Sequence, residues 1–166
     1  DSGLSLYNLY IQKGDTIKAE LILSSLLIYH PGDQDILFTR ANTQFSNQNW
    51  PDLLRTYGDI FLTDTDQVNL LVKIYEIGVA TENIELVHDI LQKLKSESDS
   101  GKILELLIAI AESKGQYDEA ITLMEELIDK NGETDELKIN LSELHLNAEH
   151  FGVVIELLDP LYENGY

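Results

Sequence analysis

Apolar residues recur along this chain at spacings of three and four residues, which is the period of an amphipathic helix. One stripe contains Leu70, Leu71 and Ile74, and polar breaks such as Gly14-Asp15 and Lys114-Gly115-Gln116 separate successive stripes. No segment shows the strict alternation of apolar and polar residues that a half-buried strand requires. The pattern predicts an all-α protein.

Ten helices account for the stripes. They are expected over residues 3–13, 16–30, 34–46, 50–63, 67–80, 84–96, 101–114, 117–130, 135–148 and 151–164. Asn49 and Asn83 stand where a side chain would cap a helix N-terminus. Pro51 falls in the first turn of its helix, where a missing N–H costs little.

The chain also repeats itself. Superposing residues 6–28 on residues 107–129 aligns Gly14 with Gly115, Ala19 with Ala120, and Leu26 with Leu127. The offset of 101 residues divides into periods of 34, 34 and 33. The intermediate registers place a large apolar residue in one shared slot: Trp50, Ile84, Tyr117 and Phe151. These periods indicate five helix–turn–helix repeats.

The repeat resembles that of the tetratricopeptide repeat (TPR) family, a helix–turn–helix unit of 34 residues. The resemblance covers essentially the whole chain and implies one α–α superhelical domain over residues 1–166. Its repeats would span about 1–33, 34–67, 68–100, 101–134 and 135–166. Helices that cannot bury their own apolar faces must stack on their neighbours, so Ala120, at the close approach of two helices, should be buried.

The resemblance implies a concave groove lined by the first helix of each repeat. Carrying the family's outward slots onto this chain gives a set of apolar, amide and acidic side chains: Asn8, Ile11, Phe38, Asn42, Phe45, Val72, Glu76, Val79, Glu105, Glu112 and Glu143. Such a groove suits a basic or amphipathic segment of another protein. Alternatively, Phe38 and Phe45 pack against neighbouring helices. The family's carboxylate clamp is not matched, because Leu4 and Asn69 stand in its lysine slots.

The charge of the chain narrows the choice of partners. Thirty acidic and 11 basic residues give a formal net charge of −19. Residues 1–67 hold 9 acids and 4 bases, whereas residues 68–166 hold 21 acids and 7 bases. An acidic surface repels phosphate backbones, so nucleic acid is not an expected partner. The acidity of the second half favours a basic ligand, although solubility alone would also account for it.

The sequence does not predict an enzyme, a cofactor or a metal centre. Neither G-x-G-x-x-G nor G-x-S-x-G occurs, and the chain has no Cys. His145, Glu149 and His150 are near one another along the chain, but a zinc site needs three or four ligands in fixed geometry, and further ligands are missing. The hypothesis that follows is a protein–protein interaction scaffold.

The last helix suggests an alternative role. It offers Val153, Val154, Leu157, Leu158 and Leu161 with no solvating helix after it. We expect that the array continues in a longer, bacterial-type protein, or that a partner or second copy covers this helix; it could equally be the cap itself. Self-association through this helix is therefore the alternative function. No 18-residue apolar stretch predicts membrane insertion, and the absence of Cys suits the cytoplasm and the bacterial periplasm equally.

Overall fold

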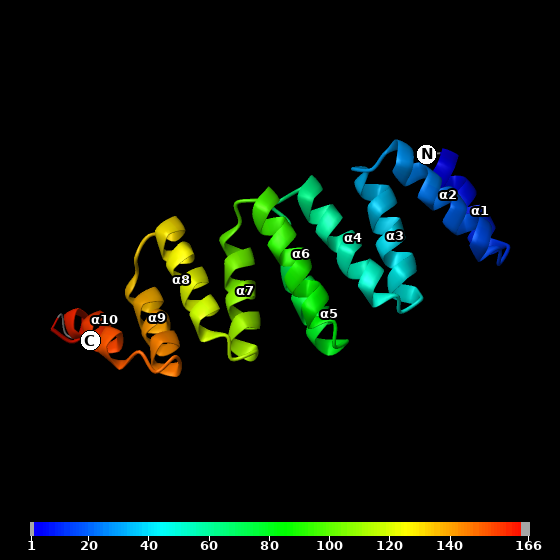
Figure 1. The fold of residues 1–166 in the computed structure, drawn as a ribbon. Helices are drawn as coiled ribbons and strands as arrows, with labels where there is room; N and C mark the ends of the chain where they lie inside the picture. Colours follow the sequence, from blue (N-terminus) through cyan, green and yellow to red (C-terminus); the bar gives the residue numbers. More distant parts are fainter. Residues whose placement is uncertain (1, 164–166) are drawn as a thin grey trace. The chain divides into compact units, whose positions relative to one another are not determined.

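A computed structural model describes the backbone of residues 2–163 and the side chains of residues 3–159. The described residues form ten α-helices and no strand (Figure 1). The helices are α1 (Ser2–Gln12), α2 (Thr16–Tyr29), α3 (Gln34–Ser46), α4 (Trp50–Thr63), α5 (Asn69–Ala80), α6 (Ile84–Glu97), α7 (Gly101–Ser113), α8 (Tyr117–Asn131), α9 (Asp135–Asn147) and α10 (Phe151–Glu163). The predicted all-α fold is confirmed, with every boundary within two residues of the expected position.

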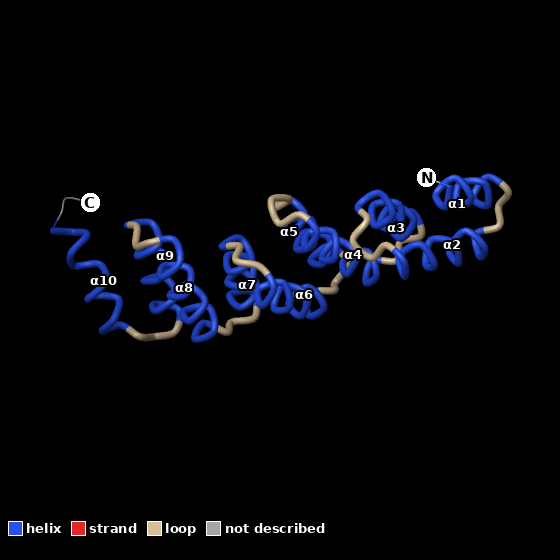
Figure 2. Tube along the Cα trace, turned by 90° about the horizontal axis from the view of Figure 1, so that it is seen from above, coloured by secondary structure: helices blue, strands red, loops and turns tan. Residues whose placement is uncertain are grey.

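Short loops join the helices throughout the described chain (Figure 2). The chain divides into two compact units, Asp1–Ile90 and Leu91–Tyr166, and the division falls within α6. In the first unit α1 packs on α2, α3 on α4, and α4 on α5. In the second unit α7 packs on α8, α8 on α9, and α9 on α10. Each unit is therefore built from helix hairpins that stack on their neighbours in sequence.

The core of the first unit begins between α1 and α2. Tyr7, Ala19, Leu23 and Ile36 are buried together there. The Tyr7 hydroxyl also lies 2.5 Å from Oγ1 of Thr43, which links α1 to α3. Further along, the apolar face of α4 is closed off from solvent at Leu53, Leu54, Ile60 and Phe61. Burial of these apolar side chains is the main source of stability for a stacked helical array.

In the second unit the tightest packing lies between α7 and α8. Ala120 is 0% exposed, as the predicted register requires. Its counterpart in the first repeat, Ala19, is 1% exposed. Ile103, Leu107 and Ile110 of α7 are closed off in the same way. Ala120 lets α7 and α8 approach closely, so a charged side chain at this position would disrupt the hairpin.

The turn between the two helices of each repeat places one residue in the left-handed region. The five residues share one slot of the repeat and have φ angles of +56 to +73°: Gly14, Gln48, Glu82, Gly115 and Glu149. Glycine adopts this conformation without strain, whereas a side chain makes it costly. Three of the five repeats therefore hold a strained residue at this turn.

Helix starts show where capping follows the sequence and where it does not. Asp15, Asp33 and Thr134 each accept a hydrogen bond from a backbone N–H in the first turn of the helix that follows. Hydrogen bonds from Lys18 lower the pKa of Asp15. The predicted side-chain cap by Asn49 is wrong. Its amide donates to Oδ2 of Asp52 at 2.8 Å instead, which leaves the cap without a side-chain bond.

Candidate protein-binding surface

Three exposed apolar side chains occupy the same slot in the first three repeats. Ile11 on α1, Phe45 on α3 and Val79 on α5 are 41%, 55% and 52% exposed. They are spaced at intervals of 34 residues, one full repeat, so each lies near the end of the first helix of its repeat. We call these three residues the apolar ladder. A single exposed apolar residue is ordinary, but a regular series on equivalent helices marks a surface that can hold another molecule.

The ladder is only partly supported by packing within the chain. Phe45 meets Trp50 edge-on, with ring centroids 5.6 Å apart, but keeps more than half of its surface in solvent. Phe38 and Val72 share another slot of the repeat and are half-buried. The alternative that both phenylalanines pack against neighbouring helices thus describes Phe38 better than Phe45.

The predicted polar residues of the first unit are exposed beside the ladder. Asn8, Asn42 and Glu76 share one slot, three residues before the ladder residue of the same helix. Asparagine amides can both donate to and accept from the backbone of a bound segment. The first unit therefore pairs an apolar series with a polar one on its first helices.

The second unit carries the acidic part of the predicted set. Glu105, Glu112 and Glu143 are all exposed. Lys102 lies 2.7 Å from Glu105, so that carboxylate is already paired. Glu112 stands in the slot that holds the ladder residues of the first unit, and the same slot in the fifth repeat holds Leu146, which is 50% exposed.

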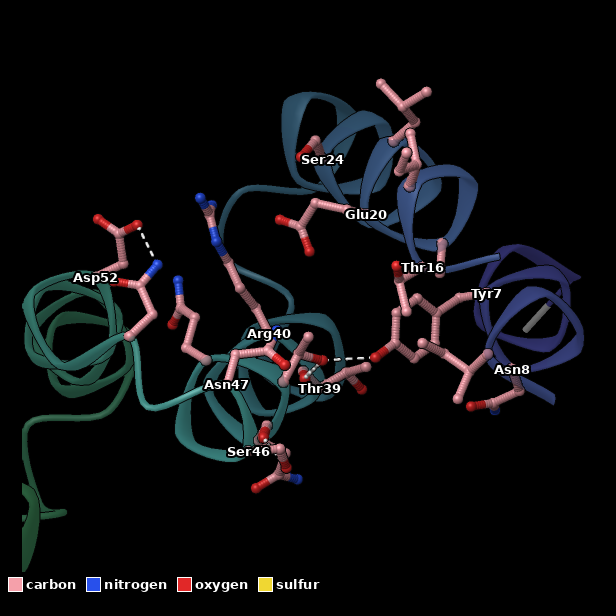
Figure 3. A pocket seen from close by; sticks show the side chains of 18 residues that line it. Tyr7, Asn8, Thr16, Glu20, Ser24, Thr39, Arg40, Ser46, Asn47 and Asp52 are labelled. Carbon is pink, nitrogen blue, oxygen red and sulfur yellow. Dashed lines mark hydrogen bonds between the residues drawn. The ribbon is translucent and has the colours of Figure 1, made fainter. Parts of the chain in front are cut away.

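A cleft of about 910 Å³ opens in the first unit, lined by residues of α1, α2 and α3 and by the start of α4 (Figure 3). Three members of the predicted set line it: Asn8, Ile11 and Asn42. Most of its other lining groups are hydroxyls, amides and charged groups, with Ile17 and Leu21 of α2 as apolar wall. The structure thus brings part of the predicted groove together with residues of a second helix that the prediction did not include.

One cleft residue is a polar side chain in an apolar slot of the repeat. Arg40 occupies the slot that the other four repeats fill with aliphatic residues: Leu6, Ile74, Leu107 and Leu141. Gln44, one turn later on α3, is only 8% exposed. Comparing each slot across the five repeats would have found Arg40 from the sequence, because it alone breaks an aliphatic series.

The histidines of the second unit form a pair rather than a metal centre. Nδ1 of His145 and Nδ1 of His150 lie 3.2 Å apart, so one ring donates a hydrogen bond to the other. Within the described residues, no group of three or more His, Cys, Asp or Glu side chains is arranged to hold a metal ion.

The last helix keeps part of its apolar surface in contact with solvent. Phe151 and Ile155 are 58% and 60% exposed, and Val153 and Leu158 are also exposed. The side chain of Leu161 lies outside the described residues. None of the helices described is both long enough and apolar enough to cross a bilayer.

Solved structures with a similar fold include PilF and two TPR proteins, YrrB and TTC0263. PilF of Pseudomonas aeruginosa is 16% identical with a TM-score of 0.50, and the match covers 100% of this chain and 76% of PilF. YrrB, a TPR protein with an unusual peptide-binding site, is 13% identical with a TM-score of 0.52, over 86% of this chain and 74% of YrrB. TTC0263, a TPR protein of Thermus thermophilus, is 15% identical with a TM-score of 0.50, over 99% of this chain and 90% of TTC0263.

No protein-family model and no curated protein sequence matches the chain. At such low sequence identity the solved structures are evidence for the fold alone. Together with the ten helices and the repeated turn, they show that the chain has the fold of the TPR proteins.

Proposed function

We propose that this chain is a protein-interaction scaffold that holds a segment of a partner against the first helices of its repeats. The observation that carries the proposal is the apolar ladder, Ile11, Phe45 and Val79, exposed at one slot in three successive repeats. These apolar side chains are exposed at a regular spacing, so they do not contribute the stabilisation that their burial would give. A bound segment that covers them recovers it.

The chemistry around the ladder favours a peptide. Large aromatic side chains such as Phe45 are typical anchors of protein interfaces. Asn8 and Asn42 offer amide groups beside them, at a spacing of one repeat. YrrB, which has a similar fold, has a peptide-binding site, and this supports the same kind of ligand here. The role proposed is one of binding, with no catalytic step.

The charge distribution favours a basic or amphipathic segment. The second unit presents Glu105, Glu112 and Glu143 on its first helices, and the whole chain has a formal net charge of −19. Acidic groups at the rim of a binding surface steer a basic ligand and repel nucleic acid. Apolar contacts would then fix how long the ligand stays bound.

The proposal is tested by measuring the binding kinetics of the native partner, or of a basic amphipathic peptide selected against the chain. Phe45→Ala should raise the dissociation rate by about tenfold or more, because an anchor is removed. The matched control is Tyr29→Ala, which removes an aromatic side chain that is 79% exposed on α2, away from the first helices. Circular dichroism should show unchanged helicity in both. Equal dissociation rates for the two variants would refute the assignment of the ladder.

Self-association is the second candidate, and it rests on Phe151 and Ile155 of α10. Two copies could bury these side chains against each other. Light scattering over a range of concentrations separates the candidates. A molar mass that rises with concentration in the wild type, but not in a Phe151→Ser, Ile155→Ser variant, would establish self-association. A constant monomer mass would exclude it.

A further inference from the structure

One side of α2 keeps apolar side chains in solvent along the length of the helix. Ile17, Leu21 and Ile28 are 75%, 62% and 76% exposed. Ser24 belongs to the same series and is half-buried. At 3.6 residues per turn, these four positions fall within an arc of about 60° around the helix. We call these four residues the α2 seam.

The opposite side of α2 is apolar as well. Ala19 and Leu23 are buried in the core of the first unit, about half a turn around the helix from the α2 seam. Ile17 and Leu21 line the open cleft of the first unit, so solvent reaches them directly. A helix that is apolar all round is normally buried on every side. The α2 seam is therefore a surface that another helix can cover.

The corresponding side of the other second helices is mostly polar. The slot of Leu21 holds Arg55, Asp89, Thr122 and Glu156, and the slot of Ile28 holds Leu62, Ser96 and Asp129. All of these side chains except Leu62 are exposed. Arg55 is exposed even though its repeat has a neighbouring repeat on both sides. A further repeat stacked before α1 would therefore leave the α2 seam uncovered, so the covering helix must lie across the outside of α2.

The distribution of charge favours a second copy of this chain as the covering molecule. Residues 1–32 hold 3 acids and 2 bases, whereas the other residues hold 27 acids and 9 bases. Beside the α2 seam, Lys18 pairs with Asp15 at 2.7 Å. A basic partner segment would be attracted to the more acidic repeats that follow. Two copies, which repel each other over most of their length, can approach with least repulsion at the first repeat.

The spacing within the α2 seam is that of a contact between two like helices. Its intervals of four, three and four residues alternate as the a and d positions of a heptad do. In a symmetric antiparallel pair, Ile17 lies beside Ile28 of the second copy, and Leu21 lies beside Ser24 of the second copy. A large and a small residue thus share each central layer. In a parallel pair, two Ser24 side chains would face each other and leave that layer underpacked.

We propose that two copies of this chain pair through antiparallel α2 helices, with the α2 seam as their contact. The pair is symmetric, so each copy contributes the same surface. It buries Ile17, Leu21 and Ile28 of both copies. This pairing goes beyond the scaffold function and involves neither the apolar ladder nor α10.

Sedimentation velocity over a range of concentrations provides the first test. The wild type should pass from monomer to dimer as its concentration rises. Leu21→Thr, Ile28→Ser introduces residues that the same slots hold at Thr122 and Ser96, and it leaves the charge unchanged. The variant should pair about 100-fold more weakly or worse, because two apolar side chains of each copy are replaced by small polar ones. Circular dichroism should show unchanged helicity, since both residues are exposed in the single chain.

Two controls should dimerise like the wild type. Tyr29→Ser removes a side chain that is 79% exposed on α2 but lies outside the arc of the α2 seam. Phe151→Ser, Ile155→Ser removes the exposed apolar side chains of α10, so it separates this pairing from self-association through the last helix. Raising the salt concentration from about 50 to about 500 mM should tighten the wild-type dimer, because it screens the repulsion between two acidic chains.

Disulfide cross-linking tests the antiparallel arrangement, and the chain has no Cys of its own. Oxidation of Ile17→Cys, Ile28→Cys should give a covalent dimer. Ile17→Cys alone should not, because the antiparallel pair separates the two copies of this residue by about 16 Å along the helices. The Cα atoms of a disulfide lie no more than about 7 Å apart.

Three results would overturn the proposal. The first is a wild type that stays monomeric up to about 100 μM, since a specific dimer should form at that concentration. The second is pairing of Leu21→Thr, Ile28→Ser with wild-type affinity. The third is a covalent dimer of Ile17→Cys alone, which would show a parallel contact. None of these results bears on the scaffold function, because the effect of Phe45→Ala on partner binding reports that function independently.

Discussion

Val87 of α6 fills the space in which a side chain on Gly78 of α5 would lie. A Cβ atom added to Gly78 would be 3.3 Å from Cβ of Val87 and closer still to its Cγ2. Val87 is 0% exposed and Gly78 is buried, so neither residue can move toward solvent. The two helices of the third repeat therefore meet at a point where only glycine fits.

Gly78→Ala should destabilise the protein. Overpacking a core contact lowers the free energy of unfolding by about 1–3 kcal/mol, and the better helix propensity of alanine offsets about 1 kcal/mol of that loss. Urea unfolding followed by circular dichroism should show a lower midpoint. Gly152→Ala in α10 is the matched control, because a Cβ there meets nothing within 4 Å. The packing account fails if Gly78→Ala is as stable as the control.

The left-handed turns allow a reciprocal test in the second unit. Gly115 and Glu149 occupy the same slot with φ angles of +69° and +62°. Gly115→Ala should lower the free energy of unfolding by about 1 kcal/mol. The reason is that a side chain is strained in the left-handed region, even though the space around Gly115 is open. Glu149→Gly should raise the free energy of unfolding by up to about 1 kcal/mol, because it removes that strain.

Unfolding midpoints of the two variants should thus move in opposite directions. Glu125→Gly, in the middle of α8, separates the turn effect from the general effect of adding a glycine, and it should be destabilising. If Glu149→Gly and Glu125→Gly behave alike, the turn is not the source of the strain.

The fold could be predicted from the sequence because the information is local and repeated. Every helix has its own apolar stripe, and alignments such as Ala19 with Ala120 fix the register between repeats. The cleft could not be predicted in this way. Arg40 breaks an aliphatic series in the sequence, but whether it has a partner depends on how closely α2 approaches α3. The side-chain cap predicted at Asn49 was wrong for a similar reason, since the amide of Asn49 donates to Asp52 and makes no capping bond to the backbone.

Tyr57 of α4 should make stability depend on pH in the alkaline range. Partial burial raises the pKa of Tyr57 above its usual value of 10.0, because the folded state disfavours the phenolate. Its contribution to stability is therefore fully present below pH 10.0 and is lost as the pH rises through the folded-state pKa. The denaturation midpoint of Tyr57→Phe should fall less steeply above pH 10.0 than that of the wild type.

Tyr29→Phe serves as the control, because Tyr29 is 79% exposed. Its alkaline profile should coincide with that of the wild type. Identical profiles for Tyr57→Phe and Tyr29→Phe would show that burial of Tyr57 does not couple its ionisation to folding.

Reversing the charges of Glu105 and Glu112 to Lys should slow the association of a basic ligand. The reason is that acidic groups at the rim act mainly on the encounter rate, through a field that salt screens over roughly 8–10 Å at physiological ionic strength. Stopped-flow association at several salt concentrations should show a lower rate for the Glu105→Lys, Glu112→Lys variant and a flatter dependence on salt. The dissociation rate should change little, in contrast to Phe45→Ala.

The control must change the net charge equally, since −19 on the whole chain also attracts a basic ligand from any direction. Glu125→Lys, Asp129→Lys serves this purpose, because both residues are exposed on α8, the second helix of the same repeat. If steering is local, the control should slow association less than the reversal on α7. Equal slowing by both pairs would mean that the ligand responds to total charge alone, and the acidic residues of the first helices would then have no special place in binding.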